Sequence, residues 1–194
     1  MKKTILFGTM LLAGVSASAQ ETVETPRFEV GANYTYIHVN PGGNLAAYNS
    51  NGGSAYVEYN INKFFGVVAD LGGTRTGVDN GVALNTTSFD YLFGPRFNFR
   101  HSRFTPYVQT LFGGERLSNG LNPGSATPLL NASQNNFAAA FGGGLDITLT
   151  KHIALKPIQV EYLMTQIAPT GSHVNYVQNN LRYSAGVVFR FGSK

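Results

Sequence analysis

Apolar and polar residues alternate along most of this chain. In residues 88–99, the clearest case, an aromatic residue occupies every second position from Phe89 to Phe99 except at Pro95. A period of two residues places alternate side chains on opposite faces of a β-strand. The alternation recurs in seven other stretches, so the sequence predicts eight strands, within residues 28–36, 54–61, 65–72, 88–99, 104–115, 136–147, 158–165 and 180–191.

Three prolines interrupt this pattern. The apolar positions before Pro157 are out of phase with those after it, which predicts a β-bulge at the start of the seventh strand. Pro95 and Pro106 lie inside the fourth and fifth stretches. Because proline cannot donate a ladder hydrogen bond, we expect local bulges or strand ends at both positions.

The connections between the predicted strands alternate in length. Short turns on one side and long loops on the other are typical of an outer-membrane barrel. The long segments are rich in Asn, Gly, Ser, Thr and Pro. The short connections are 62–63, 100–103 and 150–152, and the long ones are 38–53, 75–87, 117–134 and 168–179.

The first residues read as an export signal. A basic start precedes an apolar stretch over 5–15, and Ala17 and Ala19 form an A-x-A cleavage site. A membrane-spanning helix needs about 20 apolar residues, so this stretch is too short for an anchor. We therefore expect residues 1–19 to be a cleaved signal peptide and 20–194 to be a single exported domain.

The composition excludes several classes of protein. The chain has 14 basic and 10 acidic residues, and charged residues make up 12% of it, against about 25% in a typical soluble domain. Abundant aromatics argue against a disordered tail, and the absence of cysteine excludes a disulfide scaffold or a Cys-ligated zinc module. A net charge of +4, which includes two lysines of the signal peptide, does not favour nucleic-acid binding. Without another long apolar run, the domain could enter a membrane only as a closed barrel.

Outside the N-terminus of the mature chain, every acidic residue except Asp79 lies on one phase of the alternation. On a lipid-facing position a charge costs about 2–4 kcal/mol at the membrane midplane, so this phase must face the lumen. Arg96, Arg182 and Arg190 lie on the same phase, with Lys156 as a further candidate. The inward acids, one for each of the first seven strands, are Glu29, Glu58, Asp70, Asp90, Glu115, Asp146 and Glu161.

These lumen charges allow two interpretations. In an open lumen, the charged side chains could line an ion path or a binding cavity. We favour a polar core that plugs the barrel, because eight strands enclose a lumen that side chains can just fill. In such a core every carboxylate should be paired and hydrogen-bonded, since an unpaired buried charge is very unfavourable.

The end of the last predicted strand carries a recognisable motif. Ser184, Gly186, Phe189 and Phe191 resemble the signal that the outer-membrane barrel-assembly machinery reads: polar, x, Gly, x, x, aromatic, x, aromatic. Over residues 27–191 the chain resembles the OmpA-like eight-stranded outer-membrane β-barrels, also called the porin family. The stretches that carry this resemblance are FGPRFNFR (93–100), PYVQTLFGG (106–114) and LRYSAGVVFRFG (181–192).

The resemblance implies an all-β fold, an eight-stranded antiparallel up-and-down transmembrane β-barrel in the outer membrane of a Gram-negative cell. Its partners would be outer-membrane lipids and the assembly machinery, and we expect a monomer. The chain departs from the family in two respects. It continues for three residues past Phe191, and we expect no C-terminal peptidoglycan-binding domain after the barrel.

No catalytic constellation emerges from the sequence. His38 and His173 fall on the long-loop side, whereas His101 and His152 fall in short turns. Ser172 beside His173 is the only hint of the Ser/His pair that lipid A-modifying barrels use. We therefore expect a non-enzymatic protein without cofactor or metal, in a structural or surface role.

Four alternatives stay open at this point. They are a surface adhesin or recognition module that acts through the long loops, a lipid A-modifying enzyme, a small pore and a soluble lipocalin-like barrel. The last would need an apolar interior and a polar exterior, the reverse of the phase deduced above.

Overall fold

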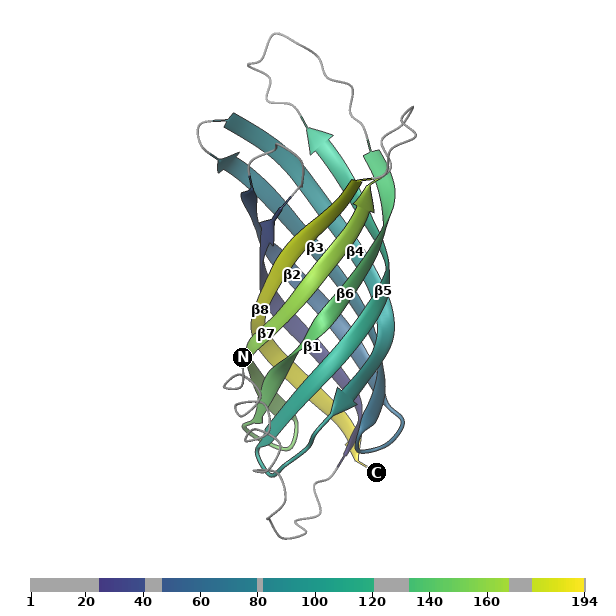
Figure 1. Ribbon diagram of the computed structural model, residues 1–194. Coiled ribbons are helices and arrows are strands. Elements are labelled where there is room, and N and C mark those ends of the chain that lie inside the picture. The colour runs from purple at the N-terminus through teal and green to yellow at the C-terminus, as the bar shows by residue number, and fades with distance from the viewer. Residues whose placement is uncertain (1–24, 41–46, 80–81, 121–132, 168–175, 194) are drawn as a thin grey trace, which may run out of the picture.

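The chain forms a closed barrel of eight antiparallel strands in the computed structural model, which describes residues 25–40, 47–79, 82–120, 133–167 and 176–193 (Figure 1). Each strand pairs with the next along the chain, and β8 pairs with β1 to close the ring. The strands are β1 (Pro26–Val39), β2 (Tyr48–Asn60), β3 (Phe65–Asp79), β4 (Val82–Asn98), β5 (Phe104–Gly120), β6 (Ser133–Thr148), β7 (Ile153–Ile167) and β8 (Tyr176–Ser193).

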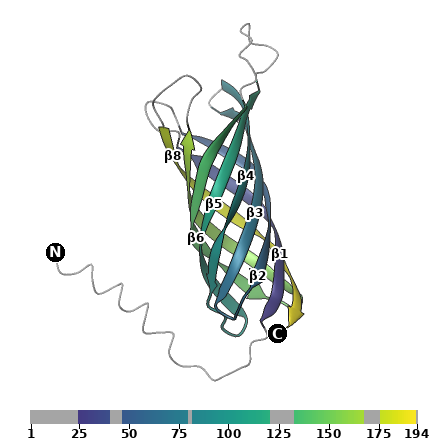
Figure 2. The ribbon, with the colours of Figure 1, turned by 90° about the vertical axis from the view of Figure 1, so that its right-hand side faces the viewer.

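This architecture confirms the predicted fold class. The strands run alternately up and down and are tilted against the barrel axis, and the C-terminus lies beside the short turns (Figures 1 and 2). We call this the short-turn end and the opposite one the long-loop end. In outer-membrane barrels the short turns face the periplasm and the longer loops face outward. Within the described part of the chain, no helix is long and apolar enough to cross a membrane.

The strands are longer than the alternation predicted. The segment 75–87, expected as a long loop, is almost entirely paired: β3 and β4 stay in contact up to the pair Asp79↔Val82, which leaves only 80–81 between them. The strands continue past the apolar band. Beyond that band the outer face of the barrel does not contact lipid chains, so its side chains need not be apolar. The sequence therefore loses its alternation there although the backbone pairing persists.

The bulge predicted beside Pro157 is present. The β7–β8 register shifts between Lys156 and Gln159, and the β6–β7 register shifts between Leu145 and Ile147 on the other side of the same strand. The shift restores the phase, so that the residues that bear charge on β7 face the lumen on both sides of the proline.

At the other two prolines we expected local bulges or strand ends: no bulge forms at either, and Pro106 does lie near a strand start. Pro95 pairs with Val67, and the β3–β4 register around it is unbroken from Phe65↔Phe97 to Thr76↔Thr86. On the β5 side the recorded pairs pass from Phe93↔Phe112 to Arg96↔Gln109 without a change of register. Pro95 therefore interrupts the ladder with β5 without shifting it. Pro106 is the third residue of β5, near the strand start, and keeps its register with β6.

The outer surface of the barrel is apolar. Neighbouring residues differ sharply in exposure: Phe93 is 52% exposed whereas Leu92 is 0% exposed. Among the described residues, no outward-facing strand position is charged between Arg27 at the short-turn end and Arg75 and Arg116 at the long-loop end. This band fits the hydrocarbon core of a bilayer, where a charge would cost about 2–4 kcal/mol at the midplane.

Candidate functional site

The polar interior of the barrel is the candidate site. All ten side chains that the sequence placed in the lumen are buried there, none of them more than 6% exposed, and Lys156 joins them at 0%. The ten are Glu29, Glu58, Asp70, Asp90, Arg96, Glu115, Asp146, Glu161, Arg182 and Arg190. Their contacts divide them into levels along the barrel axis.

Arg182 is the lumen cation nearest the long-loop end among the described residues, and the first level forms around it. Its Nη1 lies 3.1 Å from Asp70 Oδ1 and 3.0 Å from Asp90 Oδ2, and its Nε donates to Glu161 Oε2 at 2.7 Å. We call these four residues the Arg182 cluster. Because β4 lies four strands away from β8 in the ring, the contact with Asp90 spans the lumen. One guanidinium thus joins β3, β4, β7 and β8.

Arg96 organises the next level toward the short-turn end. Its Nη1 donates to Glu58 Oε2 at 2.9 Å, and its Nε donates to Gln109 Oε1 at 2.7 Å. Its guanidinium carbon lies 4.6 Å and 4.2 Å from the ring centroids of Tyr56 and Tyr107. Contacts of a cation with aromatic faces at this range are attractive, so both rings help to hold the charge.

Lys156 lies beside the same two rings. Its Nζ is 4.1 Å from the Tyr56 centroid and 4.8 Å from the Tyr107 centroid, and it donates to Gln159 Oε1 at 2.9 Å. No ion pair to Lys156 forms among the described residues within 4.0 Å. Gln159 in turn donates to Glu161 at 2.7 Å, which links this level to the Arg182 cluster.

Two glycines make room for these rings. A Cβ on Gly31 would lie 2.0 Å from Cε1 of Tyr56, and one on Gly144 would lie 2.5 Å from the hydroxyl oxygen of Tyr107. Real Cβ atoms do not approach other heavy atoms so closely. The two glycines therefore leave space on the neighbouring strands, β1 and β6, for the two aromatic rings.

A third level lies at the short-turn end. Glu29 accepts from Arg100 Nη2 at 2.5 Å and from Arg190 Nε at 3.3 Å, and Asn60 donates to it at 3.1 Å. The sequence interpretation placed Arg100 in a short turn and missed this role. A signal was present, because Arg100 continues the inward phase of Arg96 beyond the end of β4.

Two carboxylates differ from the expected pairing. Neither Glu115 nor Asp146 forms an ion pair within the described residues, although the other five lumen carboxylates do. Glu115 accepts hydrogen bonds from the hydroxyls of Ser88 and, at 2.6 Å, Thr165. Oδ1 of Asp146 is buried without a hydrogen-bond partner. The expectation that every carboxylate meets a cation therefore fails at these two positions.

The residues of the expected assembly signal run from the middle of β8 to its short-turn end. Ser184 faces the lumen, whereas Phe189 and Phe191 are 43% and 52% exposed on the outer surface. A Cβ on Gly186 would lie 2.1 Å from the carbonyl oxygen of Ala32, so glycine also serves close packing at this position. Both cleavage-site residues, Ala17 and Ala19, lie outside the described residues.

The three histidines that the structure describes do not assemble into a site. His38 is on β1 near the long-loop end, and His101 and His152 are in short turns at the opposite end. His173 and Ser172 lie outside the described residues. In the part of the chain that the structure describes, no group of three or more His, Cys, Asp or Glu side chains could hold a metal ion.

Comparisons with known structures agree with this architecture. Neisserial surface protein A (NspA) has a TM-score of 0.70 at 16% identity, and the match covers 87% of this chain and 99% of that one. Ail of Yersinia pestis, solved in complex with the heparin analogue sucrose octasulfate, has a TM-score of 0.56 at 19% identity. That match covers 84% of this chain and 97% of Ail. OprG of Pseudomonas aeruginosa has a TM-score of 0.53 at 11% identity, and the match covers 87% of this chain and 97% of that one.

At these identities the likeness to solved structures shows the fold alone. No curated protein matches the sequence. A family profile does match: the one described as the outer membrane protein beta-barrel domain covers residues 7–191, nearly the whole chain. The protein therefore belongs to the outer membrane protein β-barrel family, whose place is the outer membrane of the cell.

Proposed function

We propose that this protein is a non-enzymatic integral barrel with a structural or surface role, and that its lumen is closed by paired side chains. The Arg182 cluster is the observation that carries this proposal, because one guanidinium bonds to three carboxylates on strands from both sides of the lumen. The levels of Arg96 and Glu29 lie in series with it. An eight-stranded barrel has a lumen just wide enough for side chains to fill, and no water column is needed to solvate these charges.

The outer surface supports a monomer surrounded by lipid. The apolar side chains of the band occur on all eight strands, and many of the largest are more than 40% exposed. Lipid chains can cover such a surface completely. Insertion would depend on the assembly machinery, which would read the motif at Ser184, Gly186, Phe189 and Phe191. The protein would reach it after export through the signal peptide 1–19.

Conductance tests the closed lumen directly. In planar bilayers the purified protein should give no resolved single-channel openings, because the three levels obstruct the lumen. A water-filled porin of 16 strands, recorded in the same bilayers, serves as the positive control. Large, steady currents from this barrel would refute the proposal and favour a small pore.

Arg182→Met tests whether the cluster carries stability. The change leaves three buried carboxylates without their cation, so the free energy of unfolding should fall by about 3–5 kcal/mol, as for other broken buried pairs. The measurement is urea unfolding in lipid vesicles. Arg103→Met is the matched control: Arg103 is exposed in a short turn, and its loss should change stability by about 0.5 kcal/mol or less. Equal stabilities of both variants would argue for a solvated lumen.

Phe191→Ala tests the assembly motif. The side chain is 52% exposed toward lipid, so its loss should leave the folded barrel intact when refolded in vitro. In cells, however, the amount of folded protein in the outer membrane should drop several-fold, measured as the fraction that runs with altered mobility before boiling. Deleting Ser193 and Lys194 should have little effect. Similar losses from both changes would mean that the motif has been misassigned.

A further inference from the structure

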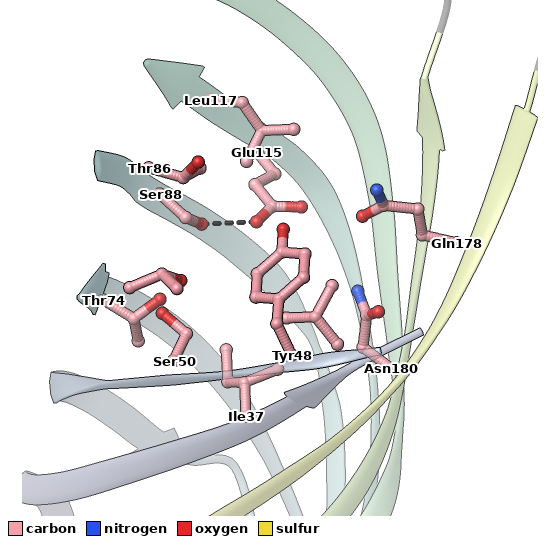
Figure 3. A pocket seen from close by; sticks show the side chains of 12 residues that line it. Ile37, Tyr48, Ser50, Thr74, Thr86, Ser88, Glu115, Leu117, Gln178 and Asn180 are labelled. Carbon is pink, nitrogen blue, oxygen red and sulfur yellow. Dashed lines mark hydrogen bonds between the residues drawn. The ribbon is translucent and has the colours of Figure 1, made fainter. Parts of the chain in front are cut away.

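A small pocket opens at the long-loop end of the lumen (Figure 3). Ser88 and Asn180, which line it, precede Asp90 and Arg182 in the chain by one step of the inward-facing alternation, toward the long-loop end. The lining combines six hydroxyl side chains and two amides with one carboxylate and three aliphatic groups. It therefore offers oxygen acceptors beside an apolar wall.

Glu115 is the charged group of this pocket. The residue is 5% exposed, and its two carboxylate oxygens accept hydrogen bonds from the hydroxyls of Ser88 and Thr165. No Lys, Arg or His among the described residues forms an ion pair with it. Hydroxyl hydrogen bonds stabilise a carboxylate without neutralising it, so the pocket holds a buried negative charge that lacks a cation.

The uneven distribution of lumen charge increases this deficit. From the Arg182 cluster to the long-loop end, the described lumen contains four carboxylates and one cation, Arg182. Toward the short-turn end it contains three carboxylates and four cations, namely Arg96, Arg100, Lys156 and Arg190. The outward half of the lumen therefore attracts positive charge, and the low-dielectric wall strengthens that attraction.

Thr74 provides an independent indication of a ligand. It lines the same pocket and is 3% exposed, yet its hydroxyl oxygen has no hydrogen-bond partner. Figure 3 shows this side chain on the pocket wall opposite Gln178 and Asn180. A buried hydroxyl without a partner is unfavourable, and a donor from a bound molecule would satisfy it.

We infer that this pocket binds a primary ammonium group that enters from the long-loop end. An ammonium has three N–H donors and no acceptor. It can donate to Glu115 and Thr74 at once while its charge neutralises the carboxylate. The aliphatic side chains of Ile37, Val39 and Leu117 can contact the carbon chain that bears the nitrogen, which favours an alkylammonium over a hydrated metal ion. The group could belong to a small amine or to a lysine side chain of a partner.

The test uses the full barrel in lipid nanodiscs, with n-butylammonium chloride as the probe and 1-butanol as its neutral counterpart. Methyl NMR signals of Thr74 and Leu117 should shift and saturate with butylammonium and should respond far less to butanol. Glu115→Gln should weaken this binding by about tenfold or more, and Thr74→Val by about threefold. Asp146→Asn, which removes the same charge at the opposite end of the lumen, is the control and should leave the affinity unchanged.

A second arm separates the two sources of the ammonium group. A short peptide with one lysine and blocked ends is titrated beside butylammonium. Binding of both assigns recognition to the ammonium group itself, and binding of the peptide alone assigns it to a lysine side chain. Saturable responses of equal size to butylammonium and butanol in the wild type would overturn the inference even if Glu115→Gln failed to fold. So would unchanged affinity in Glu115→Gln, or the absence of binding by both butylammonium and the peptide. These outcomes are independent of the conductance that tests the closed lumen.

Discussion

The bilayer core provides neither hydrogen-bond partners nor solvation for charge, and this constraint governs the whole structure. It requires a closed ring of strands, because an open edge would leave backbone groups unpaired in lipid. It also confines the charges of the membrane-spanning region to the lumen. An eight-stranded ring leaves little room there for water, so the charged side chains must solvate one another.

The lumen meets this requirement through more than ion pairs. Gln109 and Gln159 each use an amide oxygen to accept from a cation and an amide nitrogen to donate to Glu161, and so they join two levels. The aromatic faces of Tyr56 and Tyr107 take the place of a second carboxylate beside Arg96. Neutral polar and aromatic side chains thus complete a network that has seven carboxylates and five cations.

The sequence predicted the strands and the phase of the charges, because both follow from the alternation that the lipid imposes. It could not predict which charges meet. Partners such as Asp90 and Arg182 lie on opposite sides of the ring, and their level depends on the register of every strand between them. Nor did it predict the strand ends. Beyond the lipid the alternation disappears, so β3 and β4 were expected to stop before Arg75 and to start after Thr87.

The central claim is that the lumen side chains are energetically coupled and not separately hydrated. A double-mutant cycle on Arg96 and Glu58 tests it directly, using Arg96→Met, Glu58→Gln and the double variant, each unfolded with urea in vesicles. Their atoms lie 2.9 Å apart and both side chains are almost fully buried. We expect a coupling free energy of about 1–3 kcal/mol. The double variant should therefore lose less unfolding free energy than the sum of the losses in the two single variants. Strictly additive losses would show that water screens the pair and would contradict a closed, self-solvating lumen.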